Sequence, residues 1–325
     1  MDKTSPDQPI FAGITTFMRS PYVRSPEELE NYDIGVVGVP LDYGASYREG
    51  ARHAPRAIRE HSHWDDLDGG QFIDLDKDAV IAATPHSIAD IGDVTVYPTD
   101  PERTNRLIEA SVAEVRRHAF PLILGGDHSI TYAGFKGCKR GLKDEEQPMG
   151  ILHFDAHTDV EKEFGVMPRI WHGNPFRALI EEGEVHPENL VTVGPRGIVA
   201  KKWIDYVREK QIRLFTAAET RERGLSKVID DAIAYLRSRC ASVYVTFDID
   251  VIDPSQAPGT GTPCVGGLRA EELLPEIRKL SSLPVKAFDL VEVNPTLDPT
   301  GQTSVVACEV LWNYLAFGLT SRKQP

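Results

Sequence analysis

Carboxylates and imidazoles crowd three short segments of this chain, and each segment follows an apolar run. The segments are Gly125-Gly126-Asp127-His128-Ser129, His153-Phe154-Asp155-Ala156-His157-Thr158-Asp159 and Phe247-Asp248-Ile249-Asp250. The preceding runs 120–124, 149–154 and 242–247 are nearly continuous in apolar residues, which is typical of strands covered on both faces. In open parallel α/β sheets, ligands bind beyond the carboxyl ends of the strands. We therefore expect the three segments to meet in one crevice.

The spacing of the charged residues also predicts a common direction. In an extended chain, side chains two residues apart point to the same side. The residues with this spacing are Asp155, His157 and Asp159 in one segment and Asp248 and Asp250 in another. With His128 they make four carboxylates and two imidazoles around one centre. We expect His153 to face the opposite side as a hydrogen-bonded core histidine.

Such a cluster is unstable without cations. Two like charges about 4 Å apart repel by ~4 kcal/mol at an effective dielectric constant of about 20, and no Lys or Arg interrupts the three segments. Metal is the simplest solution, because two divalent ions balance four carboxylates with both histidines neutral. Oxygen-rich ligation without thiolates favours Mn²⁺, and Ni²⁺ or Co²⁺ also fit. Two ions ~3.5–4 Å apart that share a hydroxide form a hydrolytic centre, whose net negative charge suits a cationic substrate.

Eight apolar runs alternate with helix-like stretches along the chain. The runs are 34–39, 85–92, 120–124, 149–154, 190–194, 212–215, 242–247 and 285–290. The expected helices cover 55–61, 100–119, 130–140, 200–210, 225–240, 269–282 and 302–318. This alternation predicts an α/β fold, with a mostly parallel eight-stranded sheet in a single three-layer αβα domain. The domain covers residues 1–325, of which 1–30 form an N-terminal extension at an interface or at the active-site rim.

The composition narrows the class of protein. The 325 residues carry 36 Lys and Arg against 49 Asp and Glu, a net charge of −13, and 41% are hydrophobic, as in ordinary soluble globular proteins. The acidic balance argues against a nucleic-acid or membrane partner. Four cysteines without a CxxC pair indicate free thiols in a reducing compartment. There is neither a signal-peptide pattern nor a membrane-spanning run, so we expect a cytoplasmic protein.

At these segments the sequence resembles the ureohydrolase family, which includes the arginases and agmatinases. The similarity extends from residues 38–60 to Val291-Glu292-Val293-Asn294-Pro295, and the motifs GGDHS, FDAHTD and FDIDVIDPSQAPGTGTP carry it. The resemblance implies an arginase-like fold and a metal-dependent hydrolase that cleaves a C–N bond of a linear amidine and releases urea. It also implies a homotrimer or homohexamer.

The resemblance implies roles for individual residues. The implied ligands are His128, Asp155, Asp159 and Asp248 for one metal, and Asp155, His157, Asp248 and Asp250 for the other. Asp159 would also orient the hydroxide that attacks the guanidinium carbon. His172 would pass a proton to the departing amine near neutral pH. Glu292 would hold the guanidinium through charge-assisted hydrogen bonds.

The segment 160–171 bears on the substrate. Arginases carry Asn and Ser residues there that read the α-amino acid end of arginine, and this pattern is absent. The sequence is more similar to the agmatinase and guanidinobutyrase branch, so we expect a small guanidino compound such as agmatine or guanidinobutyrate. Glu161 and Glu163 would attract a second positive charge, whereas Arg169 would meet a carboxylate. Trp171 would narrow the pocket for guanidine itself, and substituted guanidines or biguanides stay open as substrates.

Other functions predict a different set of residues. A two-metal phosphoesterase would need Lys or Arg clamps or Gly-rich loops, and Arg196 is the only candidate. A related deacetylase would hold one zinc ion, whereas the ligand set here is complete for two ions. A non-catalytic partner subunit of a mixed oligomer would be expected to lose ligands, and here all six positions hold competent residues.

Overall fold

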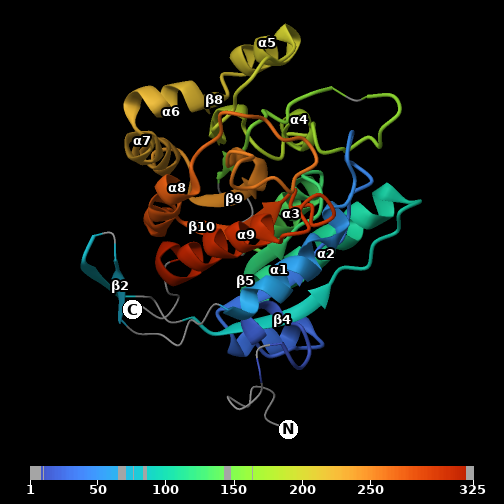
Figure 1. The fold of residues 1–325 in the computed structure, drawn as a ribbon. Coiled ribbons are helices and arrows are strands. Elements are labelled where there is room, and N and C mark those ends of the chain that lie inside the picture. Colours follow the sequence, from blue (N-terminus) through green and yellow to red (C-terminus); the bar gives the residue numbers. More distant parts are fainter. Residues whose placement is uncertain are drawn as a thin grey trace.

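An eight-stranded sheet forms the centre of the molecule (Figure 1). The computed structural model describes residues 9, 11–64, 71–75, 77–82, 86–142, 148–162 and 164–319. The strands are β1 (Ile34–Gly38), β4 (Ile88–Asp93), β5 (Phe120–Leu124), β6 (Met149–Phe154), β7 (Leu190–Val193), β8 (Arg213–Phe215), β9 (Ser242–Asp248) and β10 (Val285–Val291). Their order is β4-β1-β5-β10-β9-β6-β7-β8, and all neighbouring pairs are parallel. The predicted parallel eight-stranded sheet is confirmed.

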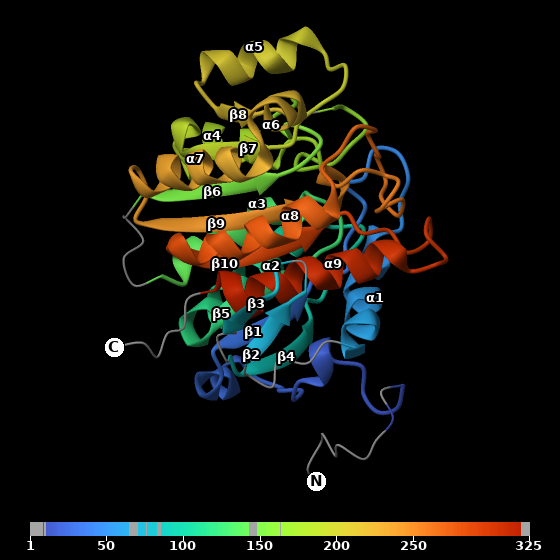
Figure 2. The same ribbon diagram turned by 60° about the vertical axis from the view of Figure 1, so that its left-hand side comes forward.

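The central strands are apolar along their length because helices cover both faces of the sheet. Every residue of β1, β5, β6 and β9 is buried, as is usual for parallel strands. One core cluster includes α1 (Ala54–His61), α7 (Leu225–Arg237), α8 (Ala270–Ile277) and α9 (Gln302–Asn313). The other includes α2 (Pro101–His118), α3 (Ile130–Arg140), α4 (Pro175–Glu181) and α5 (Lys201–Glu209). Figure 2 shows α7, α8 and α9 in front of the sheet with α2 and α3 behind it, so the three-layer arrangement is confirmed.

Three parts of the structure are absent from the sequence-based prediction. They are α4, α6 (Ala217–Arg223) and an antiparallel hairpin of β2 (Gln71–Asp74) and β3 (Ala79–Ala82). The two helices have seven residues each, too few to show a 3.6-residue rhythm. The hairpin lies outside the main sheet and packs the ring of Phe72 on Trp312, with a centroid distance of 5.5 Å. The helix expected over 302–318 is α-helical only to Asn313 and ends in a π-helical turn over Tyr314–Gly318.

The described part of the N-terminal extension packs beside the edge strand β4. Phe17 is buried, and its N–H donates to Asp90 Oδ2 at 2.9 Å. Leu29 is fully buried as well. These contacts tie the segment to the sheet, while its predicted place at an interface or at the active-site rim stays a prediction, as does the single-domain organisation of residues 1–325.

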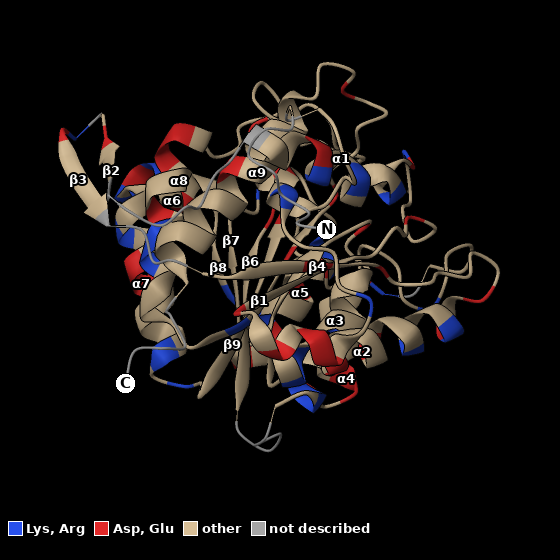
Figure 3. Cartoon of the chain, turned by 90° about the horizontal axis from the view of Figure 1, so that it is seen from below, with Lys and Arg blue, Asp and Glu red and all other residues tan. Residues whose placement is uncertain are grey.

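Charged residues gather on the helices and loops, whereas the strands are mostly free of them (Figure 3). Among the described residues, no helix has the length and apolar character required to cross a membrane.

Four adjacent strands bring the candidate segments to one edge of the sheet. Leu124 of β5 pairs with Leu290 of β10, and Val291 of β10 pairs with Asp248 of β9. β9 in turn runs level with β6, whose last residue Phe154 pairs with Phe247. The segments that follow these strands therefore begin side by side, although Gly125 and Glu292 are 167 positions apart in the sequence.

Candidate metal centre

His128 stands at the middle of three carboxylates. Its Nδ1 lies 3.1 Å from Asp155 Oδ2, 3.0 Å from Asp159 Oδ2 and 3.3 Å from Asp248 Oδ2. On the other side of the ring, Nε2 is 2.9 Å from the hydroxyl of Thr246. If Nε2–H donates to that hydroxyl, Nδ1 carries a lone pair toward the carboxylates. This is the orientation of a metal-binding imidazole held by a hydrogen bond behind it.

A second group forms around His157. Its Nδ1 lies 3.2 Å from Asp155 Oδ1 and 3.1 Å from Asp250 Oδ2. The two oxygens of Asp155 therefore face different imidazoles, Oδ2 toward His128 and Oδ1 toward His157. A carboxylate in this position can bridge two ions. The donor atoms of each group lie within 4.8 Å of one another, in the sets His128, His153, Asp155 and Asp159, and Asp155, His157 and Asp250.

Loop geometry, rather than an extended chain, makes these side chains converge. β6 ends at Phe154, and Asp159 in the following loop has a left-handed backbone with φ 46°. β9 ends at Asp248, and Asp250 sits in a 3₁₀ turn where its N–H donates to Asp248 Oδ1 at 2.8 Å. The prediction that period-two alternation aligns them is therefore wrong about the backbone, although the side chains do meet. A left-handed non-glycine residue costs about 1–3 kcal/mol and is typical of functional sites.

His128 is positioned by a close contact between the loop that contains Leu41 and the turn that contains Gly126 and Asp127. The N–H of Asp127 donates to Leu41 O at 2.7 Å. Gly126 comes so near that an added Cβ would lie 1.7 Å from the same oxygen. Only glycine fits there, which explains the glycine directly before Asp127.

Burial and like charge perturb the titration of the cluster. Burial raises the pKa of Asp248 well above its usual value, and the charges of Asp250 and Asp155 add to this. Burial and the charge of Asp155 raise the pKa of Asp159 to about 7. Burial by itself lowers the pKa of His128, but the carboxylates around it outweigh that effect and raise the pKa well above 6.5. Without cations the cluster must therefore retain protons at neutral pH, and divalent ions would displace them.

The residues fit a divalent metal by an independent criterion. Within the described part of the chain, two buried atoms of the cluster, His128 Nδ1 and Asp250 Oδ2, have ionisable neighbours within 3.3 Å but no contact with hydrogen-bond geometry. Buried polar atoms are normally hydrogen-bonded or bound to a metal. Both atoms face other members of the cluster, and carboxylate oxygens with imidazole nitrogens are suitable ligands for Mn²⁺ and similar ions.

His153 does not face away from this centre, contrary to the prediction. It is buried and hydrogen-bonded as expected, but Nε2 lies 2.7 Å from Asp155 Oδ2 and Nδ1 lies 3.1 Å from Thr192 Oγ1. Burial lowers the pKa of His153 to about 4, so the ring is neutral, Nε2–H donates to Asp155 and Nδ1 accepts from Thr192. His153 and Asp155 are two residues apart, so strand alternation itself places both side chains on the same side, and the expectation of opposite sides did not follow from the spacing.

This contact predicts a role for His153 in metal affinity. We expect His153→Phe to weaken metal binding by about 10- to 100-fold, because the hydrogen bond that orients Asp155 is lost. Calorimetric titration of the metal-free chain with Mn²⁺ measures the effect. Thr192→Val is the matched control, since it removes only the outer hydrogen bond and should change the affinity less. Equal affinities in wild type and His153→Phe would contradict the prediction.

The predicted proton donor and the predicted guanidinium-binding residue contact each other. His172 Nδ1 lies 3.1 Å from Glu292 Oε1, which also accepts the backbone N–H of His128 at 2.8 Å. Glu292 follows β10 with φ 64°, and its N–H donates to Gly126 O at 2.8 Å. Burial alone would lower the pKa of His172, but Glu292 raises it to about 9. The two side chains thus form an ion pair at neutral pH.

Trp171 lies beside His172, as its predicted place in the pocket requires. The two ring centroids are 5.4 Å apart. Trp171 is buried, and its Nε1–H donates to Lys162 O at 3.3 Å. This hydrogen bond fixes the indole next to the proton donor, while contact with substrate stays a prediction.

Arg169 is already engaged by other residues. It donates to Glu182 Oε1 at 2.9 Å and to Tyr132 Oη at 3.2 Å, so a neighbouring carboxylate balances its charge. Its predicted role in binding a substrate carboxylate stays a prediction without structural support. Glu163, the other predicted charged contact, lies outside the described residues.

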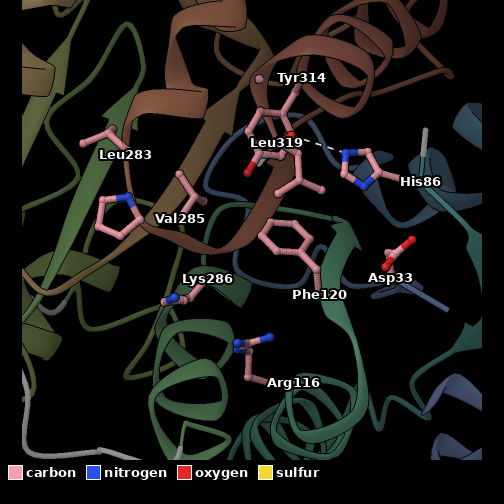
Figure 4. A pocket seen from close by; sticks show the side chains of 11 residues that line it. Asp33, His86, Arg116, Phe120, Leu283, Val285, Lys286, Tyr314 and Leu319 are labelled. Atoms are coloured by element: carbon pink, nitrogen blue, oxygen red, sulfur yellow. Dashed lines mark hydrogen bonds between the residues drawn. The ribbon is translucent and has the colours of Figure 1, made fainter. Parts of the chain in front are cut away.

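A cavity of about 300 Å³ lies at the opposite ends of the same strands (Figure 4). Phe120, at the start of β5, and Val285, at the start of β10, are among its lining residues. None of the predicted site residues that the structure describes is among them. The candidate centre therefore sits at the carboxyl edge of the sheet, apart from this cavity.

Comparison with known proteins agrees with this geometry. The sequence profile described as "Arginase family" matches residues 32–316. The chain is 36% identical over 318 residues to a guanidinobutyrase of Pseudomonas aeruginosa, covering 95% of this chain and 93% of the relative. It is 36% identical over 313 residues to a guanidinopropionase of the same organism, covering 94% and 92%.

A solved structure shows the same fold. The proclavaminate amidino hydrolase from Streptomyces clavuligerus superposes with a TM-score of 0.81 at 35% sequence identity, covering 95% of this chain and 98% of that chain. The profile match, the identity over most of the length and the shared fold agree with the cluster of His and Asp residues at the sheet edge. The chain belongs to the arginase family.

Proposed function

We propose that this protein is a binuclear-metal hydrolase that cleaves the guanidino group of a small, non-arginine substrate into urea and an amine. The observation that carries the proposal is the position of Asp155, whose two oxygens face His128 and His157. The names of the relatives, guanidinobutyrase and guanidinopropionase, support a guanidino compound as the substrate class. The net negative charge of the cluster favours a cationic reacting group.

The proposed ligands are the six clustered residues. They are His128, Asp155, Asp159 and Asp248 for one ion, and Asp155, His157, Asp248 and Asp250 for the other. Divalent ions there supply the hydrolytic nucleophile at neutral pH and stabilise charge during the reaction. We propose Mn²⁺ because the ligands are mostly oxygens, with Ni²⁺ and Co²⁺ as the alternatives.

The organic side of the site binds the substrate and moves a proton. Burial raises the pKa of Glu292, but His172 outweighs this and lowers it, so Glu292 is anionic and can accept N–H groups of the guanidinium. His172 is protonated at neutral pH because its pKa is about 9. It can therefore give a proton to the departing amine. Asp159, whose Oδ2 lies 3.0 Å from His128 Nδ1, would help to hold an ion and would accept the hydrogen of the attacking group.

A substrate panel tests this proposal. Purified protein loaded with Mn²⁺ or Ni²⁺ is assayed for urea with agmatine, guanidinobutyrate, guanidinopropionate, guanidine and biguanides, and its metal content is measured. We expect about two ions per chain and urea from at least one compound. Protein with two bound ions that releases urea from none of them would rule the proposal out. We also propose a cytoplasmic homotrimer or homohexamer, on the resemblance to the family, and light scattering measures the assembly.

Agmatine is a second candidate substrate because of Glu161. Its N–H donates to Gly173 O at 2.8 Å, which places it next to His172 in the chain fold. Burial raises its pKa, while the charges of His172 and His157 act in the opposite direction. A half-buried carboxylate this near the centre attracts a second positive charge and repels a carboxylate.

The substrate preference should therefore respond to Glu161. We expect Glu161→Gln to raise the KM for agmatine about fivefold, equivalent to ~1 kcal/mol, and to leave or lower the KM for guanidinobutyrate. Glu209→Gln on α5, an exposed acidic residue, serves as the control and should change neither value. Equal changes of KM for both substrates would show that Glu161 does not distinguish the amine of agmatine from the carboxylate of guanidinobutyrate.

A further inference from the structure

The second ring nitrogen of His172 is held by a residue that no motif of the site contains. Ser46 Oγ lies 2.7 Å from His172 Nε2, and the backbone nitrogen of Ser46 lies 3.1 Å from the same atom, where its N–H can donate when Nε2 is unprotonated. His172 is buried, whereas Ser46 is exposed. With Glu292 at Nδ1, both nitrogens of the ring have partners, and Ser46 supplies the one on the solvent side.

Backbone contacts fix the loop that carries Ser46. The N–H of Gly44 donates to Asp127 Oδ2 at 2.8 Å, and Gly44 O accepts the N–H of His172 at 3.1 Å. Asp42, which is buried, accepts the N–H of Gly50 at 2.7 Å. The loop is thus anchored to the Gly-Gly-Asp-His turn, to His172 and to itself. These contacts hold the backbone at Ser46 and do not involve its hydroxyl, so we expect the loop to keep its place when the hydroxyl is removed.

The backbone N–H and the side-chain hydroxyl of Ser46 can form different hydrogen bonds with His172. The backbone N–H can only donate, so it suits a ring whose Nε2 is unprotonated. A protonated Nε2–H needs an acceptor, and among the described residues Ser46 Oγ is the acceptor at this nitrogen. A hydroxyl can donate to Nε2 or accept from Nε2–H. It therefore keeps the ring in one orientation through a change of protonation.

We propose that Ser46 is a positioning residue for His172, which holds Nδ1 toward Glu292 in both protonation states of the ring. The inference rests on the proposed function, because it assigns Ser46 to the proton transfer of that reaction. The charged groups that face His172 come from other elements: Glu292 after β10, Asp127 before α3, and Asp159 and Glu161 after β6. All four are acidic, and a substitution at Ser46 alters none of them.

Two matched substitutions separate the hydroxyl from the rest of the side chain. Ser46→Thr keeps the hydroxyl. Ser46→Val has the shape of the threonine variant but lacks the hydroxyl, and Ser46→Ala removes the hydroxyl with the smallest side chain. We expect Val and Ala to lower kcat about tenfold or more with KM within about twofold, because orientation of a general acid matters in the proton-transfer step. The basic limb of their pH profile should move to lower pH by about one unit. Threonine should retain activity within about threefold of wild type.

Activity equal for the Thr and Val variants, with unchanged pH profiles, would overturn the inference. A parallel fall of kcat in all three variants would do so too, since it would show that only the shape of the loop matters. Imidazole ¹⁵N and ¹H NMR of the full metal-free chain gives a readout that needs no substrate: the titration of His172 should shift down in Val and Ala but not in Thr. If wild type releases no urea from any compound, the proposed function fails, and the NMR comparison still decides whether Ser46 holds the ring.

Discussion

Asp155→Asn is expected to lower urea release by about 10³-fold or more and to leave fewer than two tightly bound ions per chain. The carboxylate is buried, and its two oxygens face His128 and His157. Asparagine has one carbonyl oxygen and an NH₂ group, so it cannot bind an ion on each side, and it removes one negative charge from the centre. Urea assay and elemental analysis of the purified protein measure both effects.

Two controls make the Asp155 result specific. Asp205→Asn removes an exposed carboxylate on α5, where it pairs with Lys201, and should leave activity and metal content unchanged. The melting temperature of the metal-free Asp155→Asn chain shows whether the fold is intact. A variant that keeps two ions per chain and activity within tenfold of wild type would contradict the bridging assignment.

Glu292→Gln is expected to lower kcat/KM by about 10²- to 10³-fold. Truncating one partner of a buried charge pair costs about 3–5 kcal/mol, and the guanidinium loses the carboxylate that we propose holds it. The substitution also removes the group that raises the pKa of His172 to about 9. The basic limb of the activity profile should therefore move to lower pH. Glu292→Asp keeps the charge on a shorter side chain, so its kcat/KM should lie between those of wild type and Glu292→Gln. An unchanged kcat/KM in Glu292→Gln would contradict a role of Glu292 in holding the guanidinium.

The same pair predicts how the stability of the metal-free chain depends on pH. The pKa of His172 is raised from 6.5 to about 9 in the folded state, because Glu292 outweighs the opposing effect of burial. The stabilisation is fully present below pH 6.5 and is lost as the pH rises through about 9. Denaturant unfolding at several pH values should show this loss in wild type and a smaller one in Glu292→Gln. Identical slopes for both proteins would exclude a stabilising His172–Glu292 pair.

The sequence alone determined the strands and the chemistry of the site. Most of the eight strands were recognisable from local composition, because the central parallel strands are covered on both faces and are apolar along their length. Four carboxylates without interleaved cations require metal once parallel strands bring the three segments together. These inferences succeed because they depend on local composition and on the rule that parallel strands end at the same side of a sheet.

Some predictions are wrong or incomplete in the structure. His153 was expected opposite Asp155, although a spacing of two residues puts both side chains on the same side of a strand, where they are hydrogen-bonded. The short helices α4 and α6 gave no periodic signal. Arg169 looked like a free cation in the sequence, whereas in the structure it pairs with Glu182 on α4.

The tertiary structure decided which distant residues share a proton or a charge. Ser46 and His172 are 126 positions apart, and His128 and Glu292 are 164 apart, yet both pairs are in hydrogen-bond contact. No local propensity reports such pairs, because they depend on the strand order that sets β5 beside β10 and on a loop that folds back over the Gly-Gly-Asp-His turn. The residue types indicated the reaction class. The strand order and the path of the loop around Ser46 decided which atoms face each other.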